Sequence, residues 1–216
     1  MINTVIFDMD GLMIDSEPLH YQAFAKVFEE FSKHFPQEDN KKYYIALSDI
    51  DEANDMVKRY QFTVTPEEIV ERKKVAYKKL GSSAIVPKTG LIELLKQLDN
   101  QGYKKAIASS SSLEEIELVI KGLGINKYID TFCSGEQVEH GKPAPDVYLL
   151  AASTLGVKPS ECLVLEDAPK GIDAAIAAGM RVFAIPSNET KDGDFTRATR
   201  KLASLSDVFF HLQQQD

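Results

Sequence analysis

Five short apolar stretches recur along the chain, and segments with helical spacing separate them. The stretches are Thr4–Phe7, Ala106–Ser109, Thr131–Ser134, Leu163–Leu165 and Val182–Ile185. Strand-length runs that alternate with helical segments are typical of βα units, in which the strands pair in parallel and helices cover both faces of the sheet. The alternation therefore predicts an α/β fold with a Rossmann-like, doubly wound parallel sheet as its core.

Some segments between these runs carry signals for their local structure. Ser112 and Glu115 have the spacing of a capping box, in which two side chains bond backbone N–H groups at the start of a helix. Pro169 and Gly179 bracket an alanine-rich segment, which predicts a helix that packs closely on the sheet. The stretch Pro186–Asp194 is polar and rich in turn-forming residues, so it predicts an exposed loop.

The segment between the first two predicted strands has a different character. Leu19, Ala23, Val27 and Phe31 recur every four residues, which predicts a helix, and Thr65-Pro66 is a typical start for another. We therefore expect an inserted helical bundle.

The insertion predicts a division into two domains. We expect residues 1–15 and 85–216 to form the α/β core and residues 16–84 to form a helical cap domain. The chain then crosses between them twice, near residues 14–17 and 81–87. Two crossings are the geometry of a cap that can hinge over a site.

Two carboxylates stand at the end of the first predicted strand, in the run Val5-Ile6-Phe7-Asp8-Met9-Asp10-Gly11. Residues two apart in an extended chain project to the same side, and the carboxyl ends of parallel strands open into the ligand crevice of such a sheet. Asp8 can attack a phosphoryl group and bind a cation. Asp10 can give and take protons and offer its backbone carbonyl to the same cation.

An Asp-x-Asp pair alone is weak support for catalysis, because acidic loop residues are common, but three other segments add to it. Ser109 ends the second apolar run, Glu166-Asp167 follows the fourth, and Lys142 lies in Gly141-Lys142-Pro143. Each of these polar groups alone has an ordinary explanation as a surface or turn residue. Their common position near strand ends favours one shared site.

These four segments resemble the ordered motifs of haloacid-dehalogenase-type phosphohydrolases, over nearly the whole chain. The start Phe7–Leu12 with Asp15-Ser16-Glu17 is similar to the branch that holds β-phosphoglucomutase and small-metabolite phosphatases. The stretches His140–Asp146 and Glu166–Gly171 are similar to the pseudouridine monophosphate phosphatases of that branch. The resemblance implies a phosphoryl-transfer enzyme, because related dehalogenases generally lack a carboxylate at the position of Asp10.

The resemblance also implies a mechanism and a metal cofactor. Asp8 is expected to form an aspartyl-phosphate, while Asp10 protonates the leaving oxygen and later deprotonates water. Mg²⁺ prefers oxygen ligands and offsets phosphate charge. We expect it to bind the Asp8 side chain, the Asp10 backbone carbonyl and Asp167, with Glu166 bound directly or through water.

The same resemblance implies the groups that bind the transferred phosphate. Lys142 is expected to hold the phosphoryl group, and Ser109 is expected to add a hydroxyl and a backbone amide, with Ser110 beside it. Gly11 is expected to let the chain turn sharply beside the anion. Ser111 or Ser112 is expected to serve only as a helix cap.

The resemblance implies a phosphorylated small metabolite as the substrate, either a sugar phosphate or a nucleoside monophosphate, and it leaves two activities open. A mutase of this branch tends to place a basic cap residue against a second phosphate, whereas Leu47–Glu52 is acidic here. This favours hydrolysis of a monophosphate over mutase action. His20 and Lys73 resemble substrate-binding cap residues of sugar-phosphate mutases, which keeps the mutase as the alternative.

Both cap residues also have ordinary explanations. His20 can simply flank a core helix, and Lys73 in Arg72-Lys73-Lys74 can lie on a solvated face. A third hypothesis is a phosphometabolite-binding module without turnover. It is the least favoured, because every catalytic position of the motifs is present.

Composition excludes several classes of partner. A formal net charge of −8 over 216 residues argues against tight binding to nucleic acid or anionic membranes. The N-terminal apolar run is short and interrupted by acids, and no stretch can span a bilayer, so we expect a cytoplasmic protein. Cys133 and Cys162 are expected to be buried thiols. The oligomeric state stays open, and a monomer is compatible with the sequence.

Overall fold

The structure, a computed structural model, describes residues 1–44, 47–81 and 85–214. The chain divides into two compact units: Met1–Asp15 with Val86–Asp216, and Ser16–Ile85. Part of the predicted second crossing, at residues 82–84, lies outside the described residues. In the described ranges, none of the helices combines the length and apolar composition needed to cross a bilayer.

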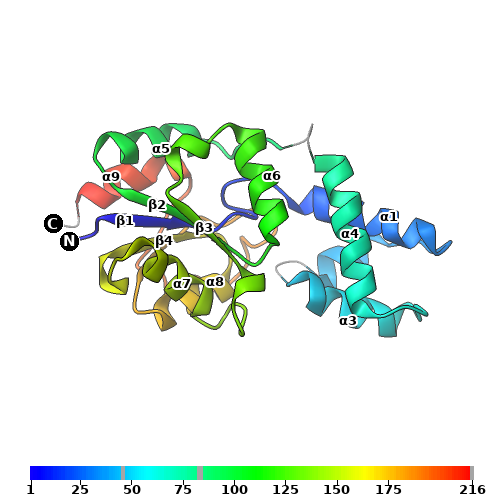
Figure 1. Cartoon of the computed structure of the whole chain (residues 1–216). Coiled ribbons are helices and arrows are strands. Elements are labelled where there is room, and N and C mark those ends of the chain that lie inside the picture. Colours follow the sequence, from blue (N-terminus) through cyan, green and yellow to red (C-terminus); the bar gives the residue numbers. More distant parts are fainter. Residues whose placement is uncertain (45–46, 82–84, 215–216) are drawn as a thin grey trace. The chain divides into compact units, whose positions relative to one another are not determined.

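The first unit is built on a parallel sheet (Figure 1). Its strands in the described residues are β1 (Thr4–Phe7), β2 (Lys104–Ser109), β3 (Thr131–Ser134), β4 (Cys162–Glu166), β5 (Arg181–Ala184) and β6 (Arg200–Lys201). They lie in the order β3-β2-β1-β4-β5-β6, and every neighbouring pair is parallel. The predicted doubly wound parallel sheet is confirmed. Only the two-residue edge strand β6 had no signal in the sequence.

The direction of winding reverses at β1. The chain passes from β1 to β2 and β3 on one side, and then returns to β4 on the other side. In an open α/β sheet, the crevice beyond the carboxyl ends of the strands at such a reversal is the usual ligand site. The topology therefore predicts a ligand site at the residues that follow β1, β2 and β4.

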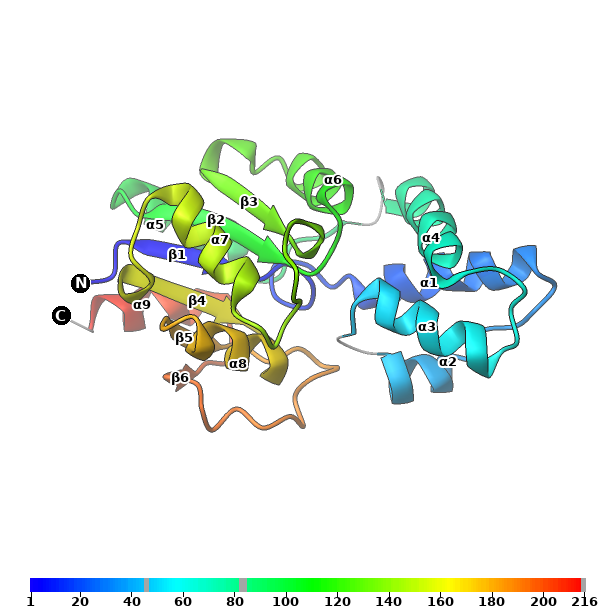
Figure 2. The same ribbon diagram turned by 60° about the horizontal axis from the view of Figure 1, so that its bottom comes forward.

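Helices cover both faces of this sheet. They are α5 (Leu91–Asn100), α6 (Leu113–Leu123), α7 (Asp146–Leu155), α8 (Pro169–Ala177) and α9 (Val208–Gln213), with short 3₁₀ turns η2 (Asn126–Tyr128), η3 (Gly135–Gln137), η4 (Pro159–Glu161) and η5 (Leu205–Asp207). In Figure 1, α5 and α9 lie over one face, and α7 and α8 lie over the other. Figure 2 turns the face with α7 and α8 toward the viewer.

The central strands are apolar because both of their faces are covered. Ile6 of β1 and Val164 of β4 are fully buried in one cluster with Ala174 and Ala175 of α8. The small alanine side chains let α8 approach the sheet closely, as its composition predicted. Helix α8 begins at Pro169, also as predicted.

The start of α6 follows directly from its sequence. The Glu115 backbone N–H donates to Ser112 Oγ at 3.3 Å, and the Ser112 backbone N–H donates to Glu115 Oε2 at 3.0 Å. These bonds form the predicted capping box, and they satisfy N–H groups that have no partner inside the helix. Ser112, rather than Ser111, is therefore the cap.

The second unit is helical and has its own core. Its elements are α1 (Glu17–Glu30), α2 (Gln37–Asp39), the π-helical turn η1 (Asn40–Tyr44), α3 (Asp49–Arg59) and α4 (Pro66–Gly81). Helix α4 packs against both α1 and α3. The Phe28 ring stacks on Phe35, with centroids 4.7 Å apart, and meets Phe62 edge-on at 4.9 Å. Aromatic burial of this kind supplies the core that stabilises the helical bundle.

The two chain segments that leave and re-enter the first unit run beside each other within it. Ile14 forms an antiparallel bridge with Pro87, and the Lys88 backbone N–H donates to the Met13 carbonyl at 2.8 Å. Within the first unit, the segments around Ile14 and Pro87 are therefore joined side by side in a short antiparallel pairing.

Candidate active site

The register of the sheet brings the predicted motifs to one edge. Phe7 pairs with Ile107 on one side and with Leu165 on the other. Asp8 therefore emerges between the ends of β2 and β4, and its backbone N–H donates to the Leu165 carbonyl at 3.0 Å. Ser109 and Glu166 end those two neighbouring strands.

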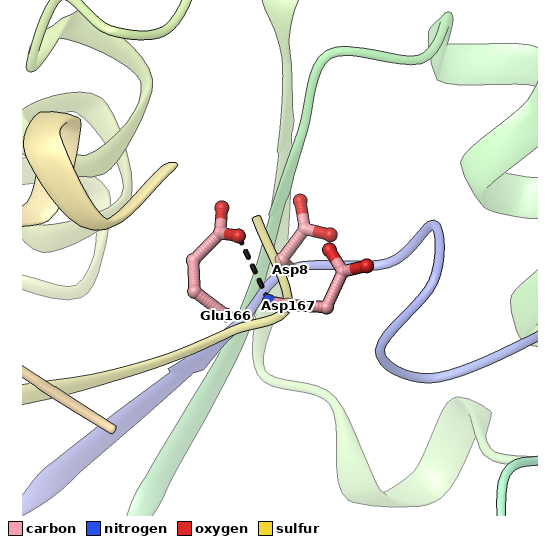
Figure 3. Close-up of side chains that lie close together, drawn as sticks. All are labelled: Asp8, Glu166 and Asp167. Atoms are coloured by element: carbon pink, nitrogen blue, oxygen red, sulfur yellow. Dashed lines mark hydrogen bonds between the residues drawn. The ribbon is translucent and has the colours of Figure 1, made fainter. Parts of the chain in front are cut away.

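Three carboxylates gather at this edge (Figure 3). Asp8, Glu166 and Asp167 are all buried, and each offers a carboxylate oxygen within 4.8 Å of those of the other two. Asp8 follows β1, whereas the other two come from the end of β4. Burial makes uncompensated charge expensive, so the cluster requires positive charge nearby.

Lys142 supplies one positive charge to this cluster. Its Nζ donates to Asp8 Oδ1 at 2.6 Å, to Glu166 Oε1 at 2.7 Å and to the Ala108 carbonyl at 3.3 Å. The lysine lies in the loop before α7, far in sequence from its partners. Its three donors are all used, so the position of the ammonium group is well defined.

Glu166 is held from several directions. Its Oε2 accepts the backbone N–H groups of Asp167 and Ala168, both at 3.0 Å. Its Oε1 accepts Lys142 and, in addition, the Tyr148 hydroxyl at 2.6 Å. Tyr148 carries no functional signal in the sequence, because its place in the apolar pattern of α7 predicts only a core residue.

Gly171 of α8 is essential to the position of Glu166. A Cβ at Gly171 would lie 1.6 Å from Glu166 Oε1, which no real structure allows. The glycine thus leaves the space that the carboxylate fills.

The loop after β5 reaches back to Asp167. The Thr190 hydroxyl donates to the Asp167 backbone carbonyl at 2.6 Å, and its oxygen lies 3.3 Å from Asp167 Oδ2. Thr190 is itself tied to Ser187, whose backbone N–H donates to the threonine hydroxyl at 3.0 Å. The prediction that Pro186–Asp194 is simply an exposed loop was therefore wrong for Ser187, which is buried, and for Thr190.

Gly11 lies where its predicted turn beside the site requires a glycine. Its φ is +80°, and a Cβ there would lie 2.2 Å from Asp167 Oδ2. The close neighbour in this structure is thus a carboxylate that belongs to the acidic cluster.

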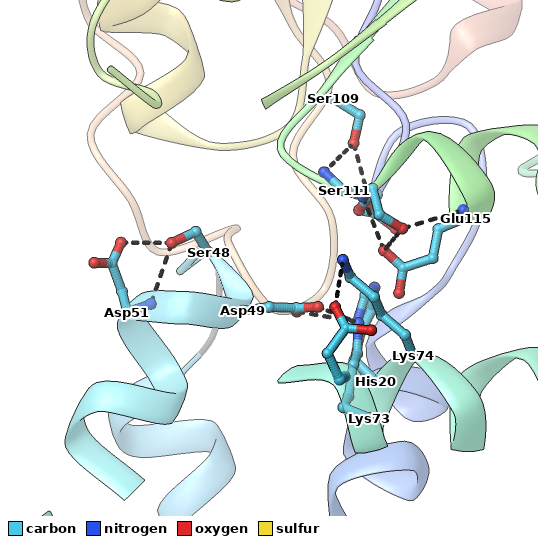
Figure 4. Close-up of polar contacts among 12 residues, drawn as sticks. His20, Ser48, Asp49, Asp51, Lys73, Lys74, Ser109, Ser111 and Glu115 are labelled. Atoms are coloured by element: carbon cyan, nitrogen blue, oxygen red, sulfur yellow. Dashed lines mark hydrogen bonds and ion pairs between the residues drawn. The ribbon is translucent and has the colours of Figure 1, made fainter. Parts of the chain in front are cut away.

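Asp10 meets the serine-rich loop after β2. Its Oδ2 accepts the Ser111 hydroxyl at 2.6 Å and the Ser109 hydroxyl at 3.2 Å. Figure 4 shows the two serines, which are also joined by a bond from the Ser111 backbone N–H to Ser109 Oγ at 3.0 Å. Ser111 thus faces Asp10 and is not the helix cap, while Ser110 is exposed.

The electrostatics of the site reflect an excess of acid. Burial, followed by Glu166, raises the pKa of Asp167 to about 7, although Ser187, Lys142 and Thr190 oppose this shift. Burial also raises the pKa of Asp8. For Lys142, burial disfavours the charge, but Asp8 and Glu166 outweigh it and raise its pKa well above the ordinary value.

The donor set fits a divalent cation. Hard carboxylate oxygens from Asp8, Glu166 and Asp167 converge in a buried cluster with more negative charge than Lys142 neutralises. Such all-oxygen sets suit Mg²⁺. The close approach that Gly11 permits keeps the Asp167 carboxylate beside the turn after β1.

The two cap residues from the sequence analysis meet in the second unit, around Asp49 (Figure 4). Lys73 Nζ lies 2.7 Å from Asp49 Oδ2, and His20 Nδ1 lies 4.0 Å from Asp49 Oδ1. Lys73 is 0% exposed, with its ammonium 4.8 Å from the centre of the Tyr77 ring. The explanation of Lys73 as part of a solvated face was therefore wrong. It is a buried cation paired with an acid of the segment Leu47–Glu52.

The known proteins that this chain resembles agree on a single family. The sequence model described as haloacid dehalogenase-like hydrolase matches residues 5–185. A probable pseudouridine-5'-phosphatase of Drosophila melanogaster is 35% identical over 211 residues, covering 94% of this chain and 89% of that protein. A phosphorylated carbohydrates phosphatase of Thermotoga maritima is 30% identical over 185 residues, with 85% of each chain covered.

A solved structure agrees with these matches. The protein CbbY of Rhodobacter sphaeroides, in complex with phosphate, superposes with a TM-score of 0.89 at 26% identity and covers 96% of both chains. The superfamily and its β-phosphoglucomutase and pseudouridine monophosphate phosphatase branch, predicted from the motifs, are confirmed. The chain therefore belongs to the haloacid dehalogenase-like hydrolase family and is a phosphoester hydrolase.

Proposed function

We propose that this protein is a Mg²⁺-dependent phosphatase that hydrolyses a small phosphate monoester through an aspartyl-phosphate on Asp8. The main support is the ion-paired arrangement of Asp8, Lys142 and Glu166, because one ammonium group lies 2.6 Å and 2.7 Å from two buried carboxylates. That arrangement puts a fixed positive charge beside a candidate nucleophile. Electrostatic positioning of this kind is the main contribution that a protein makes to phosphoryl transfer.

The chemistry needs only two side chains for covalent and proton-transfer steps. Oδ1 of Asp8 stays with Lys142, and the other oxygen attacks phosphorus as the bond to the leaving oxygen breaks. Asp10, protonated at that moment, gives its proton to the leaving oxygen and releases the alcohol. Asp10 then takes a proton from water as the water oxygen attacks phosphorus, which breaks the bond to Asp8 and releases inorganic phosphate.

The metal has a clear place in this proposal. Asp8, Asp167 and the backbone carbonyl of Asp10 would hold it. Glu166 would add negative charge beside it without ligating it, because Lys142, Tyr148 and two backbone N–H groups already occupy its acceptor positions. Bound Mg²⁺ supplies positive charge that lets an anionic ester approach carboxylates. Thr190 and Ser187 keep Asp167 in position for this role, since Thr190 is bonded to the Asp167 backbone carbonyl at 2.6 Å.

The proposed phosphate-binding groups are Lys142, Ser109 and Ser110, with the turn at Gly11. Lys142 would exchange its longest bond, 3.3 Å to the Ala108 carbonyl, for a phosphate oxygen. Ser109 reaches Asp10 Oδ2 at 3.2 Å, which supports a place for its hydroxyl beside the reacting groups. Ser111 donates to the same oxygen at 2.6 Å, so we add it to the proposed phosphate-binding groups. Its role is to hold Asp10 until a substrate competes for the serine hydroxyls.

The helical insertion, residues 16–84, is proposed as a cap that selects the substrate, with residues 1–15 and 85–216 as the catalytic core. The bridge between Ile14 and Pro87 supports a hinge, because both connecting segments leave the core side by side. Sugar phosphates and nucleoside monophosphates are the proposed substrates. This choice rests on the named activities of the relatives.

A β-phosphoglucomutase-like mutase is the alternative, with His20 and Lys73 as the supporting residues. A mutase has to bind a second phosphate, which requires an available cation. Lys73 is already 2.7 Å from Asp49, so its charge is largely balanced within the helical unit. This ion pair favours the phosphatase. A binding module without turnover has the least support.

Released phosphate separates these functions. The enzyme is incubated with Mg²⁺ and a panel of sugar phosphates and nucleoside monophosphates, with a chelator as the metal-free reference. Mg²⁺-dependent phosphate release supports the phosphatase. Interconversion of hexose phosphates without net release supports the mutase, and tight binding with neither outcome supports the module.

The Asp8→Asn variant tests the nucleophile. Asparagine has nearly the same shape but is a far weaker nucleophile, so we expect kcat to fall by about 10³-fold or more with the fold intact. Asp173→Asn is the matched control, since Asp173 lies on α8 and forms a surface ion pair with Arg197. Turnover by Asp8→Asn near the wild-type rate contradicts the assignment of Asp8.

A further inference from the structure

Tyr148 lies under the catalytic ion pair and contacts both of its members. It is fully buried in α7, six residues after Lys142. Its hydroxyl donates to Glu166 Oε1 at 2.6 Å, and the Lys142 ammonium lies 4.8 Å from the centre of its ring. One side chain therefore supports the carboxylate by a hydrogen bond and the ammonium by a cation–π contact.

The hydrogen bonds of Glu166 show why the hydroxyl matters. A carboxylate has about four acceptor positions. Two are filled by the backbone N–H groups of Asp167 and Ala168 at Oε2, and Lys142 and Tyr148 fill the other two at Oε1. Rotation of the carboxylate breaks several of these bonds together, so the four donors fix its orientation.

Gly171 confines the carboxylate on the remaining side. A Cβ there would lie 1.6 Å from Oε1, so the backbone of α8 lies close to the same oxygen that accepts Tyr148. Oε1 is thus held between a helix backbone, an ammonium group and a phenol. These three contacts restrain Glu166 Oε1 to one position.

The orientation of Glu166 in turn determines where Lys142 lies. The lysine bridges Oε1 of Glu166 and Oδ1 of Asp8 over 2.7 Å and 2.6 Å. If Oε1 moves, the ammonium group follows one carboxylate or the other, and the charge beside Asp8 changes. The contacts therefore form a chain from Tyr148 through Glu166 and Lys142 to Asp8.

We propose that the Tyr148 hydroxyl is a positioning group for phosphoryl transfer, which keeps Glu166 oriented so that Lys142 stays beside Asp8. Its kinetic consequence rests on the proposed phosphatase function. The hydroxyl does not touch the substrate, and it acts through the orientation of two charged side chains. Groups of this kind around catalytic and metal centres contribute about 10–100-fold to activity or affinity.

The test compares Tyr148→Phe with Tyr128→Phe. Both changes remove one phenol oxygen and keep the ring, but Tyr128 lies in η2, outside the cluster. For Tyr148→Phe we expect kcat to fall by about 10–100-fold. KM should stay within about twofold, and Tyr128→Phe should match the wild type. A Tyr148→Phe enzyme with wild-type kcat overturns the proposal.

A double-mutant cycle separates positioning from packing. Tyr148→Phe is made in the Glu166→Ala background, where the acceptor of the hydroxyl is gone. We expect the second change to alter kcat there by no more than about twofold, because interacting residues are not additive. Equal losses in the two backgrounds identify a packing effect and overturn the proposal. Thermal melting of all four proteins checks that each is folded.

Orthovanadate binding makes the test independent of turnover. The dissociation constant of orthovanadate with Mg²⁺ is measured by calorimetry for the same four proteins. We expect Tyr148→Phe to weaken it by about 10–100-fold in the wild-type background only. If no phosphate ester is hydrolysed but this pattern appears, the proposed function fails and the positioning role stands. If esters are hydrolysed but the pattern is absent, the positioning role fails alone.

Discussion

Single glycines determine how closely the charged groups of this site approach the backbone. At Gly11 and at Gly171, the space for a Cβ is occupied by the carboxylates of Asp167 and Glu166, at 2.2 Å and 1.6 Å. Any other residue at these positions displaces an acid of the cluster. The absence of a side chain at Gly11 and Gly171 thus helps to position these two acids.

The Gly11→Ala variant tests this point. Alanine at φ +80° costs about 1–2 kcal/mol of strain, and its methyl group collides with Asp167 Oδ2. We expect kcat to fall by about 100-fold and Mg²⁺ affinity, measured by calorimetry, to weaken by about tenfold.

Gly156→Ala is the matched control. Gly156 also has a positive φ, +65°, but a Cβ there meets nothing within 4 Å. We expect a similar loss of stability with unchanged kcat. If both variants keep wild-type kcat, the close approach of Gly11 to Asp167 has no role in the site.

Residues that carry formal charge in motifs were predictable, whereas residues that support them were not. Lys142 and Glu166 were identified from the sequence, and the structure brings them to 2.7 Å. Tyr148 gave no signal, because an aromatic residue in the apolar stripe of a helix is expected in any core. Its hydroxyl reaches Glu166, at the end of β4, only because α7 packs on β2 and β3 and contacts α8, and no local pattern encodes that packing.

At the scale of secondary structure, the elements were more predictable than the loops. Strands and capped helices follow from periodicity and from end signals such as the capping box at Ser112. The loop after β5 shows the limit. Its polar sequence resembles any surface loop, yet Thr190 bonds the Asp167 backbone carbonyl at 2.6 Å and is tied to Ser187 at 3.0 Å.

The Thr190→Val variant tests the contribution of this loop. Valine keeps the shape but removes the hydroxyl, so the Asp167 carbonyl and the Ser187 N–H lose a partner. We expect Mg²⁺ affinity and kcat to fall by about tenfold, with Thr190→Ser close to the wild type.

Thr196→Val is the control, because the Thr196 hydroxyl donates to the exposed Asp194, at 2.7 Å, away from the acidic cluster. Wild-type metal affinity in Thr190→Val shows that the loop does not position Asp167.

At the scale of the whole molecule, the two units have separate cores, so each has its own free energy of unfolding. The helical unit contains a buried acid with a raised pKa. Glu52 is buried, and burial, then Asp49 and Glu17, raise its pKa well above the ordinary value, although Lys73 opposes this shift. The folded state holds the Glu52 proton more tightly than the unfolded state does. The contribution of this proton to the stability of the helical unit is therefore complete below the unfolded pKa, and it is lost as pH rises through the folded pKa.

The Glu52→Gln variant removes this titration. We expect the free energy of opening of residues 16–85, from hydrogen exchange, to exceed that of the wild type at about pH 8 and to match it near about pH 4. Strands of the sheet should exchange equally in both proteins.

Glu71→Gln is the control, since Glu71 is 71% exposed on α4. Its effect should stay within about 0.5 kcal/mol at every pH. A Glu52→Gln protein with the pH profile of the wild type shows that Glu52 does not hold its proton in the folded helical unit.

The central place of β1 has a consequence for how the chain is made. Its residues pair with residues 104–107 and 162–165, so on the ribosome β1 emerges long before either neighbour exists. The helical unit is complete in sequence once Ile85 has left the exit tunnel, and its contacts are local, which favours rapid folding. Asp8 meets Glu166 and Asp167 only when about three quarters of the polypeptide has been translated. A nascent or prematurely terminated product that lacks β4 therefore has no acidic cluster and stays inert.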